Sequence, residues 1–291
     1  MSYLEAFLQA VLQGLTEFLP VSSSGHLSLF QHFTGTSGEA GVFFSLMLHL
    51  GTLIAVFIAF RKTIWQLILE FFSIFGEIFT GKFSWKNRTP YRHMLFMFVI
   101  ACVPMIFVLV FKDFYTAFSA DDNIFWEGVF FLVTAAMLFM ADRCVKGKKG
   151  PGEIQPRDAA LVGIFQAVAP LPGVSRSGST ISAGLLSGMN RETAVQFSFI
   201  LGIPAILGGS VSEILDVTPA KVASVGLGPV LLGIVVSAVV GLLAIRMEAY
   251  IIKTDKFRIF VWYTAILGVV VIAVSLFEMA VGMNIVRYFA G

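Results

Sequence analysis

The sequence predicts an all-α polytopic membrane protein whose two halves form an inverted-topology repeat. Three observations predict this fold class: a very apolar composition, six apolar runs of spanning length, and one polar motif that occurs in each half. Of the 291 residues, 57% are hydrophobic and 13% are charged, and the mean hydropathy is +0.86. Soluble domains carry about 25% charged residues. A chain of this composition must bury most of its surface in lipid.

Six stretches are apolar over roughly the 20 residues that a helix needs to cross about 30 Å of hydrocarbon. They lie at residues 41–60, 94–111, 124–141, 194–212, 224–245 and 259–277. The apolar stretch 3–18 lacks the basic start of a cleaved signal peptide and carries Glu5 and Glu17, so we expect it to be retained. Residues 64–79 are apolar on one side only, which favours a continuation of the preceding helix or an interfacial helix over a seventh span.

An internal repeat is visible when the sequence is compared with itself at an offset of 153 residues. VSSSGH at Val21–His26 then falls on VSRSGS at Val174–Ser179, and eleven of the 36 positions from 13 to 48 are identical. Chance would give roughly two or three identities. An accidental match of two apolar segments is the alternative, but shared polar residues such as Gln13 and Gln166 argue against it. The repeat divides the chain into residues 1–150 and 151–291.

Each half consists of a broken hairpin followed by three spans, and an odd number of spans between the copies inverts the second copy. The hairpins, residues 5–35 and 158–188, contain Pro20 in the first and Pro170 and Pro172 in the second, so neither reads as one continuous helix. Irregular backbone at membrane depth must be enclosed by protein or water. We therefore expect two re-entrant hairpins whose tips face each other inside the bundle.

The basic residues of the loops predict the orientation. Three loops that parity places on one side are basic, and we assign them to the cytoplasm, which puts both termini outside. These basic residues are Arg61, Lys62, Lys82, Lys86, Arg88 and Arg92 in one loop, Arg143, Lys146, Lys148, Lys149 and Arg157 in the next, and Arg246, Lys253, Lys256 and Arg258 in the third. The opposite loops are acidic or balanced, with Lys112, Asp113, Asp121 and Asp122 in one and Glu213, Asp216 and Lys221 in the other.

The two hairpins carry the polar groups from which we predict chemistry. Gln13 and Glu17 are four residues apart and share a helix face that Pro20 ends. The following Ser22–Gly25 segment offers hydroxyls and free backbone N–H groups at a helix start, where the helix dipole favours an anion. The second copy adds Arg176, whose planar guanidinium matches phosphate oxygens.

These groups together predict a phosphate site with acid and base groups beside it. Phosphoryl transfer needs both, because the charge on the transferred group must be stabilised while a nucleophile is activated. A simple anion carrier has less use for Glu17 and His26, although His26 in a polar break can also serve as a hydrogen-bond partner. We interpret His49, within an apolar run, as structural. The net charge of +2 comes without the basic patches of nucleic-acid binders, and Cys102 and Cys144 form no metal-binding spacing.

The segments QGLTEFLPVSSSGH (Gln13–His26) and PGVSRSGST (Pro172–Thr180) resemble the signatures (E/Q)xxxE and PGxSRSxxT of the bacterial undecaprenyl pyrophosphate phosphatase family. This is the integral-membrane family linked to bacitracin resistance, and the length and span pattern agree over essentially the whole chain. The resemblance implies removal of the terminal phosphate from a C55 isoprenyl diphosphate, which yields the lipid carrier for peptidoglycan and other envelope polymers. It also implies a divalent cation, Mg²⁺ or Ca²⁺, and a site on the outer face of the bacterial inner membrane.

Within the motifs, the resemblance implies that Glu17 and Arg176 are essential, that Ser23 is the nucleophile with His26 as its acid/base partner, and that Glu17 binds the cation. We expect the other polar and glycine residues of the motifs to bind substrate: Gln13, Ser22, Ser24, Gly25, Ser175, Ser177, Gly178 and Thr180. Many relatives carry glutamate where this chain has Gln13. Because glutamine cannot act as a base, we expect Gln13 to orient a metal, a water or a phosphate.

Two mechanisms and two function classes stay open at this level. Ser23, activated by His26 or Glu17, attacks the terminal phosphorus and water then hydrolyses the phosphoserine, or metal-bound water attacks directly. The alternative function is a lipid-phosphate transporter or flippase that uses the same anion site. The expected partners are a polyprenyl diphosphate and membrane lipid but no nucleic acid. The oligomeric state stays open, with a homodimer as one alternative.

Overall fold

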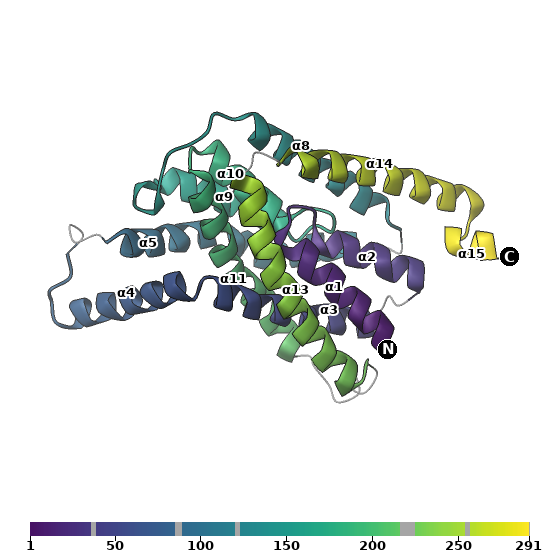
Figure 1. Cartoon of the computed structure of the whole chain (residues 1–291), viewed down its shortest axis with the longest axis horizontal. Coiled ribbons are helices and arrows are strands. Elements are labelled where there is room, and N and C mark those ends of the chain that lie inside the picture. The colour runs from purple at the N-terminus through teal and green to yellow at the C-terminus, as the bar shows by residue number, and fades with distance from the viewer. Residues whose placement is uncertain (36–38, 85–88, 120–122, 216–224, 254–256, 291) are drawn as a thin grey trace.

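The structure, a computed structural model, describes residues 1–35, 39–84, 89–119, 123–215, 225–253 and 257–290, and these contain helices but no strand (Figure 1). The predicted all-α class is confirmed. The elements are α1 (Tyr3–Phe18), α2 (Ser23–Thr34), α3 (Glu39–Ala59), α4 (Arg61–Phe79), α5 (Pro90–Cys102), η1 (Val103–Met105), α6 (Ile106–Val110), α7 (Lys112–Ser119), α8 (Phe125–Arg143), η2 (Pro151–Glu153), α9 (Pro156–Val168), α10 (Arg176–Leu186), α11 (Arg191–Leu215), α13 (Leu227–Lys253), α14 (Arg258–Val281) and α15 (Ile285–Ala290).

Five of the described helical segments are long and apolar enough to cross a membrane: Ala40–Ala59, Pro90–Val108, Phe125–Arg143, Leu227–Ile252 and Arg258–Val281. They coincide with five of the six predicted spans. The second is not one regular helix, because a 3₁₀ turn that contains Pro104 interrupts it. The remaining predicted span, 194–212, lies within α11, which has Pro204 in its interior and is not among the five.

Several of the loop charges behind the predicted orientation belong to segments outside the described residues. Lys86, Arg88, Asp121, Asp122, Asp216, Lys221 and Lys256 lie outside the described residues, as does the first residue of the predicted span 224–245.

The amphipathic segment predicted at residues 64–79 is present as α4, which begins directly after Phe60 at the end of α3. Its polar residues turn toward α5, where Arg92 is buried and donates hydrogen bonds to Glu70 at 2.9 Å and to Glu77 at 2.7 Å. The other side of α4 exposes large apolar side chains, among them Trp65, Phe72, Phe75 and Phe79. An interfacial helix has the opposite arrangement, with its polar side toward water. In Figure 1, α4 and α5 extend away from the remaining helices.

Small residues allow the main helix pairs to pack closely. α1 and α3 both pack along α13, and α8 packs along α14. Where α8 and α14 cross, a Cβ added to Gly128 would lie 3.0 Å from the Gly268 carbonyl oxygen, and one on Gly268 would lie 2.8 Å from the Gly128 carbonyl oxygen. Such close backbone approach is typical of helix pairs in membranes, where apolar burial does not drive association.

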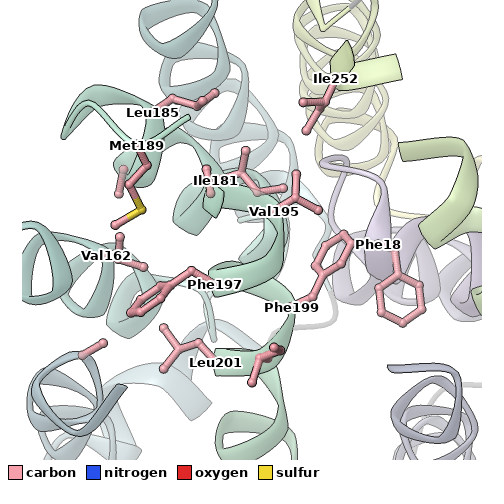
Figure 2. Packing of buried hydrophobic residues seen from close by; sticks show 14 of the residues in the cluster. Phe18, Val162, Ile181, Leu185, Met189, Val195, Phe197, Phe199, Leu201 and Ile252 are labelled. Atoms are coloured by element: carbon pink, nitrogen blue, oxygen red, sulfur yellow. The ribbon is translucent and has the colours of Figure 1, made fainter. Parts of the chain in front are cut away.

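Helix α11 joins the two broken hairpins through the largest apolar cluster (Figure 2). Phe199 of α11 packs edge-to-face on Phe18 at the end of α1, with ring centroids 5.3 Å apart. Ile181 of α10 and Val162 of α9 belong to the same cluster. Because Phe18 follows Glu17 and Ile181 lies in the helix that begins at Arg176, this packing holds the two polar segments in register.

Candidate active site

Both predicted breaks are present, and both copies of the motif start a helix in the same way. α1 ends at Phe18 and α2 begins after the N-cap Ser22, whose hydroxyl accepts from the Gly25 N–H at 3.3 Å. α10 begins after the N-cap Ser175, whose hydroxyl accepts from the Gly178 N–H at 3.0 Å. A serine N-cap satisfies one free N–H of the first turn. The predicted helix N-termini are therefore built by equivalent residues.

The copies differ in backbone strain at the cap. Ser22 has φ 71°, the only positive φ of a non-glycine residue in the described chain, whereas Ser175 has φ −79°. A left-handed conformation costs an L-residue about 1–2 kcal/mol. The first copy therefore carries strain that the second does not.

The two tips touch through reciprocal contacts. A Cβ on Gly25 would lie 2.9 Å from the Gly173 Cα, and one on Gly178 would lie 3.2 Å from the Pro20 Cβ. An offset of 153 residues carries Gly25 to Gly178 and Pro20 to Gly173, so the same pair of positions meets twice. The Ser177 hydroxyl also donates to the Leu19 carbonyl at 3.2 Å. The tips face each other, as the sequence predicted.

Gly25→Ala is expected to lower the free energy of unfolding by about 1–3 kcal/mol. The added Cβ would lie 2.7 Å from Phe131 and 3.0 Å or less from the backbone of Gly173, and backbone cannot yield as a flexible side chain can. Thermal unfolding in detergent measures the effect. Gly76→Ala in exposed α4 is the control, because nothing lies within 4 Å of its Cβ position. Equal unfolding temperatures for the two variants would contradict tight packing of the tips.

The carboxylate of Glu17 is the centre of the polar cluster. Its side chain is 5% exposed, and its Oε1 accepts from Arg176 Nη2 at 2.9 Å. Its Oε2 accepts from the Ser23 hydroxyl at 2.6 Å and from Gln13 Nε2 at 3.0 Å. Three predicted residues thus meet on one carboxylate, although 159 residues separate Glu17 from Arg176. The guanidinium compensates a charge that would otherwise be buried alone.

Arg176 is held on its other side by α11. Its Nη1 donates to the Ser198 carbonyl at 3.2 Å, and a Cβ on Gly202 would lie 2.6 Å from the same nitrogen. Any side chain at position 202 would displace the guanidinium. Thr180 donates to the Arg176 carbonyl at 2.8 Å and shares a hydrogen bond with the Ser198 hydroxyl. The predicted role of Thr180 in substrate binding is untested, and in this structure it ties α10 to α11.

Both ring nitrogens of His26 have partners other than Ser23. Nδ1 lies 2.7 Å from the Ser22 carbonyl, and because a carbonyl only accepts, Nδ1 carries the proton. Nε2 lies 2.7 Å from the Tyr263 hydroxyl, and the His26 and Tyr263 rings stack with centroids 5.7 Å apart. The Ser23 hydroxyl is directed to Glu17 instead. An acid/base role for His26 stays a prediction, and this arrangement favours Glu17 as the base.

His49 is a site residue that we interpreted from the sequence as structural. Its Nδ1 bonds the Ser45 carbonyl at 2.8 Å, and its Nε2 points to Glu17, 3.6 Å from Oε2. The side chain is 29% exposed, so it stands between solvent and the buried carboxylate. One signal could have revealed it: the offset of 153 aligns His49 with Gly202, directly after the identical pair Leu48 and Leu201. The two copies of the repeat therefore differ at this position: His49 in the first copy contacts Glu17, whereas Gly202 in the second copy leaves space for Arg176.

His49→Gln is expected to lower kcat for the site's reaction about three- to tenfold with little change in KM. The imidazole orients the Glu17 carboxylate at Oε2, whereas Arg176 binds Oε1. We expect the glutamine amide to hold this carboxylate less well. Steady-state kinetics measure the two constants. His93→Gln is the control, because the His93 ring bonds the Ile154 carbonyl and not a residue of the site. If both variants keep wild-type kcat, His49 is structural after all.

The serine hydroxyls differ in accessibility. Ser23 and Ser24 are half-buried, whereas Ser22, Ser175 and Ser177 are buried. The buried ones bond within the protein: Ser22 to Ser24 at 3.4 Å and Ser175 to Ser177 at 3.3 Å. Ser23, Ser24 and His49 are partly exposed and are therefore accessible to a phosphate group. A cavity elsewhere in the described chain is lined by Cys144, Arg191, Ile252 and neighbours, and none of the predicted site residues lines it.

The donor atoms at the site fit a divalent cation only together with substrate. Among the described residues, no three His, Cys, Asp or Glu side chains are grouped as a metal site. Glu17 supplies one carboxylate, and the buried Oε1 of Gln13 has no hydrogen-bond partner in the described chain. Mg²⁺ is commonly held by one or two carboxylates plus substrate phosphates. Glu17 and Gln13 are thus of the right chemistry to complete such a set.

Comparison with known proteins places the chain among relatives of similar length. A family model described as "Bacitracin resistance protein BacA" matches residues 6–270. The undecaprenyl-diphosphatase of Alkaliphilus metalliredigens is 39% identical over 277 residues, covering 95% of this chain and 100% of that protein. Undecaprenyl-diphosphatase 4 of Bacillus thuringiensis is 37% identical, covering 94% and 98%. The undecaprenyl-diphosphatase of Syntrophotalea carbinolica is 37% identical, covering 94% and 100%.

Proposed function

Because the chain belongs to the family of the bacitracin resistance protein BacA, we propose that it hydrolyses undecaprenyl diphosphate to undecaprenyl phosphate and inorganic phosphate. It is a multi-pass membrane protein. The relatives are phosphatases by name, which favours this function over the transporter alternative. The product, undecaprenyl phosphate, is the lipid carrier on which cell-wall polymers are built, so the reaction regenerates this carrier.

One observation carries the proposal: Arg176 and the Ser23 hydroxyl bind the two oxygens of the same buried carboxylate, at 2.9 and 2.6 Å. The arginine supplies positive charge for phosphate, and the serine is a nucleophile already bonded to a base. When a diphosphate binds, its oxygens compete with Glu17 for the guanidinium. A carboxylate that loses its counter-ion is a stronger base, so substrate binding itself would activate Ser23.

The reaction then proceeds in two displacements. Ser23 Oγ forms a bond to the terminal phosphorus as Glu17 takes its proton, and the bridging P–O bond breaks as Glu17 passes that proton to the leaving undecaprenyl phosphate. Water next attacks the phosphoserine as Glu17 takes a proton from it, and the Oγ–P bond breaks to release inorganic phosphate while Glu17 returns the proton to Ser23 Oγ. Arg176 and the N–H groups at the start of α2 and α10 stabilise the charge on the phosphoryl group throughout.

A divalent cation is part of this proposal. Glu17 and Gln13 would hold it with the substrate's phosphate oxygens. When bound, it would add positive charge where negative charge develops on the transferred group.

Release of inorganic phosphate from undecaprenyl diphosphate by the purified protein in detergent, with Mg²⁺ or Ca²⁺ supplied, is the direct test. We expect release that depends on the enzyme and is lost in Glu17→Gln. Glu192→Gln, at an exposed position in the first turn of α11, is the matched control and should behave as wild type. No release with either cation, together with movement of the lipid between leaflets of liposomes, would favour the transporter instead.

The proposal extends to the arrangement in the membrane. Residues 1–150 and 151–291 form an inverted repeat with two re-entrant hairpins, α1–α2 and α9–α10. The reciprocal tip contacts support it, because a two-fold relation exchanges Gly25 with Gly178 and Pro20 with Gly173. Both termini lie outside the bacterial inner membrane and the site opens to the outer face. In a chain without Cys102 and Cys144, an impermeant thiol reagent added outside should label Ser2→Cys and spare Lys148→Cys; the reverse would overturn the orientation. A homodimer stays a prediction.

A further inference from the structure

A second carboxyl, Glu248 of α13, is buried without any partner. Its side chain is 0% exposed. Neither carboxyl oxygen has a hydrogen-bond partner in the part of the chain that the structure describes. Glu17, by contrast, has partners for both oxygens. The mechanism above uses Glu17 and leaves Glu248 unexplained.

Glu248 lies beyond the tip that carries the active site. α1 and α13 run parallel, because Tyr3 meets Gly228 and Gly14 meets Val240. α1 ends at Phe18, which packs on Gly241, while α13 continues to Lys253. Glu248 follows Gly241 by seven residues, which is two helical turns or about 10 Å along the same face.

The surroundings of Glu248 are apolar. Ala244, Ile245 and Ile252 share its buried face and belong to the largest apolar cluster. α1 and α3 meet this face of α13 through Phe18 and Ala55 at Gly241. Among charged groups, Arg191 of α11 reaches the Ile252 carbonyl one turn further on. Arg61 and Lys62 of α4 and Arg246 of α13 are exposed.

An ionised carboxylate in apolar surroundings, with no partner, is strongly disfavoured inside a membrane protein. The acid is therefore neutral in this arrangement and holds a proton. Even the neutral group leaves a donor and an acceptor unsatisfied, which costs less but still disfavours burial. An arrangement of the bundle that lets water reach this face of α13 would favour release of the proton.

We propose that Glu248 is a proton-binding site beyond the active-site tip. Its carboxyl group holds a proton in the closed arrangement described here, in which Glu248 is buried. It releases the proton to water when the bundle opens on the side of Glu248. The bond that breaks is the carboxyl O–H, and the proton passes to water. Proton occupancy thereby biases the balance between the closed and open arrangements. This role does not depend on the hydrolytic reaction.

Labelling with dicyclohexylcarbodiimide tests whether Glu248 is protonated and buried in apolar surroundings. This apolar reagent modifies carboxyl groups that are protonated and in apolar surroundings. Treatment of the full-length protein in detergent at neutral pH, followed by peptide mass spectrometry, should show an adduct on Glu248 and none on the ion-paired Glu17. A water-soluble carbodiimide should modify exposed Glu192 but not Glu248. An unmodified Glu248, or one that reacts as Glu192 does, overturns the proposal.

Proteoliposomes with an imposed pH difference test the coupling. We expect the pH difference to change the rate of phosphate release by wild type by about fivefold or more, the lower end of ordinary coupling between sites. Glu248→Gln, which stays neutral, should release phosphate in detergent as wild type does and should not respond to the pH difference. Glu248→Met is the second variant if Glu248→Gln does not accumulate. An equal response in wild type and variant, or none in either, overturns the coupling while leaving the phosphatase proposal intact.

Discussion

Arg176→Lys is expected to lower kcat for phosphate release by about 10²- to 10³-fold, the loss typical of removing one preorganised group that stabilises transition-state charge. Arg176 uses two ends of its guanidinium, Nη2 on Glu17 at 2.9 Å and Nη1 on Ser198 at 3.2 Å. A lysine ammonium keeps the charge but cannot span both partners or present a planar fork to phosphate. Steady-state release of inorganic phosphate in detergent measures the loss, and Arg157→Lys, at a position 78% exposed, is the control.

A stability cycle separates the structural and chemical roles of Arg176. Arg176→Met leaves Glu17 as a buried charge without its counter-ion, which costs about 3–5 kcal/mol of unfolding free energy. Adding Glu17→Gln removes that charge, so the double variant should regain much of the stability and remain inactive. If the double variant is as unstable as Arg176→Met, the ion pair is not what holds the tips together, and the role we assign to it is wrong.

Ser23→Ala is expected to reduce phosphate release by about 10³-fold or more, because it removes the attacking atom and not merely a contact. The matched control is Ser24→Ala, the neighbouring half-buried hydroxyl, whose hydrogen bond to Ser22 is long at 3.4 Å. It should lose less than about fivefold. The two variants differ by one position in the same helix turn, so a shared folding defect would appear in both.

Trapping the phosphoserine distinguishes the two chemical routes. Rapid acid quench during turnover of a diphosphate labelled in its terminal phosphate should leave label on the peptide that contains Ser23 and none in Ser23→Ala. Activity of Ser23→Ala within about fivefold of wild type, with no label on the wild-type peptide, would mean that water attacks the phosphorus directly.

The sequence predicted the local parts of the site because local chemistry determines them. The positions of the breaks follow from Pro20 and Pro172, and the helix starts follow from serine caps that act within three residues. That the tips meet was also predictable, since irregular backbone at membrane depth needs cover. The Glu17–Ser23 bond is local in the same sense, spanning six residues.

The parts that sequence reasoning missed are contacts between distant elements. Tyr263 reaches His26 across 237 residues, and no property of α14 distinguishes that tyrosine from others in the sequence. His49 looked structural because its neighbours along the chain are apolar, whereas the structure places its Nε2 3.6 Å from Glu17 of α1. The inward polar side of α4 depends on packing against α5, which periodicity within one segment does not reveal.

The separation of Glu17 from Arg176 along the chain has a consequence for biosynthesis. The ribosome makes the Glu17 hairpin 159 residues before the arginine that neutralises it. At about 5–20 residues per second, the carboxylate waits roughly 8–30 s for its counter-ion. During that time the first hairpin has its own Ser23 and Gln13 contacts but no opposite charge and no opposing tip. The candidate site is thus completed only after most of the chain has been made, and a chain released before α10 would retain a Glu17 carboxylate without its arginine partner.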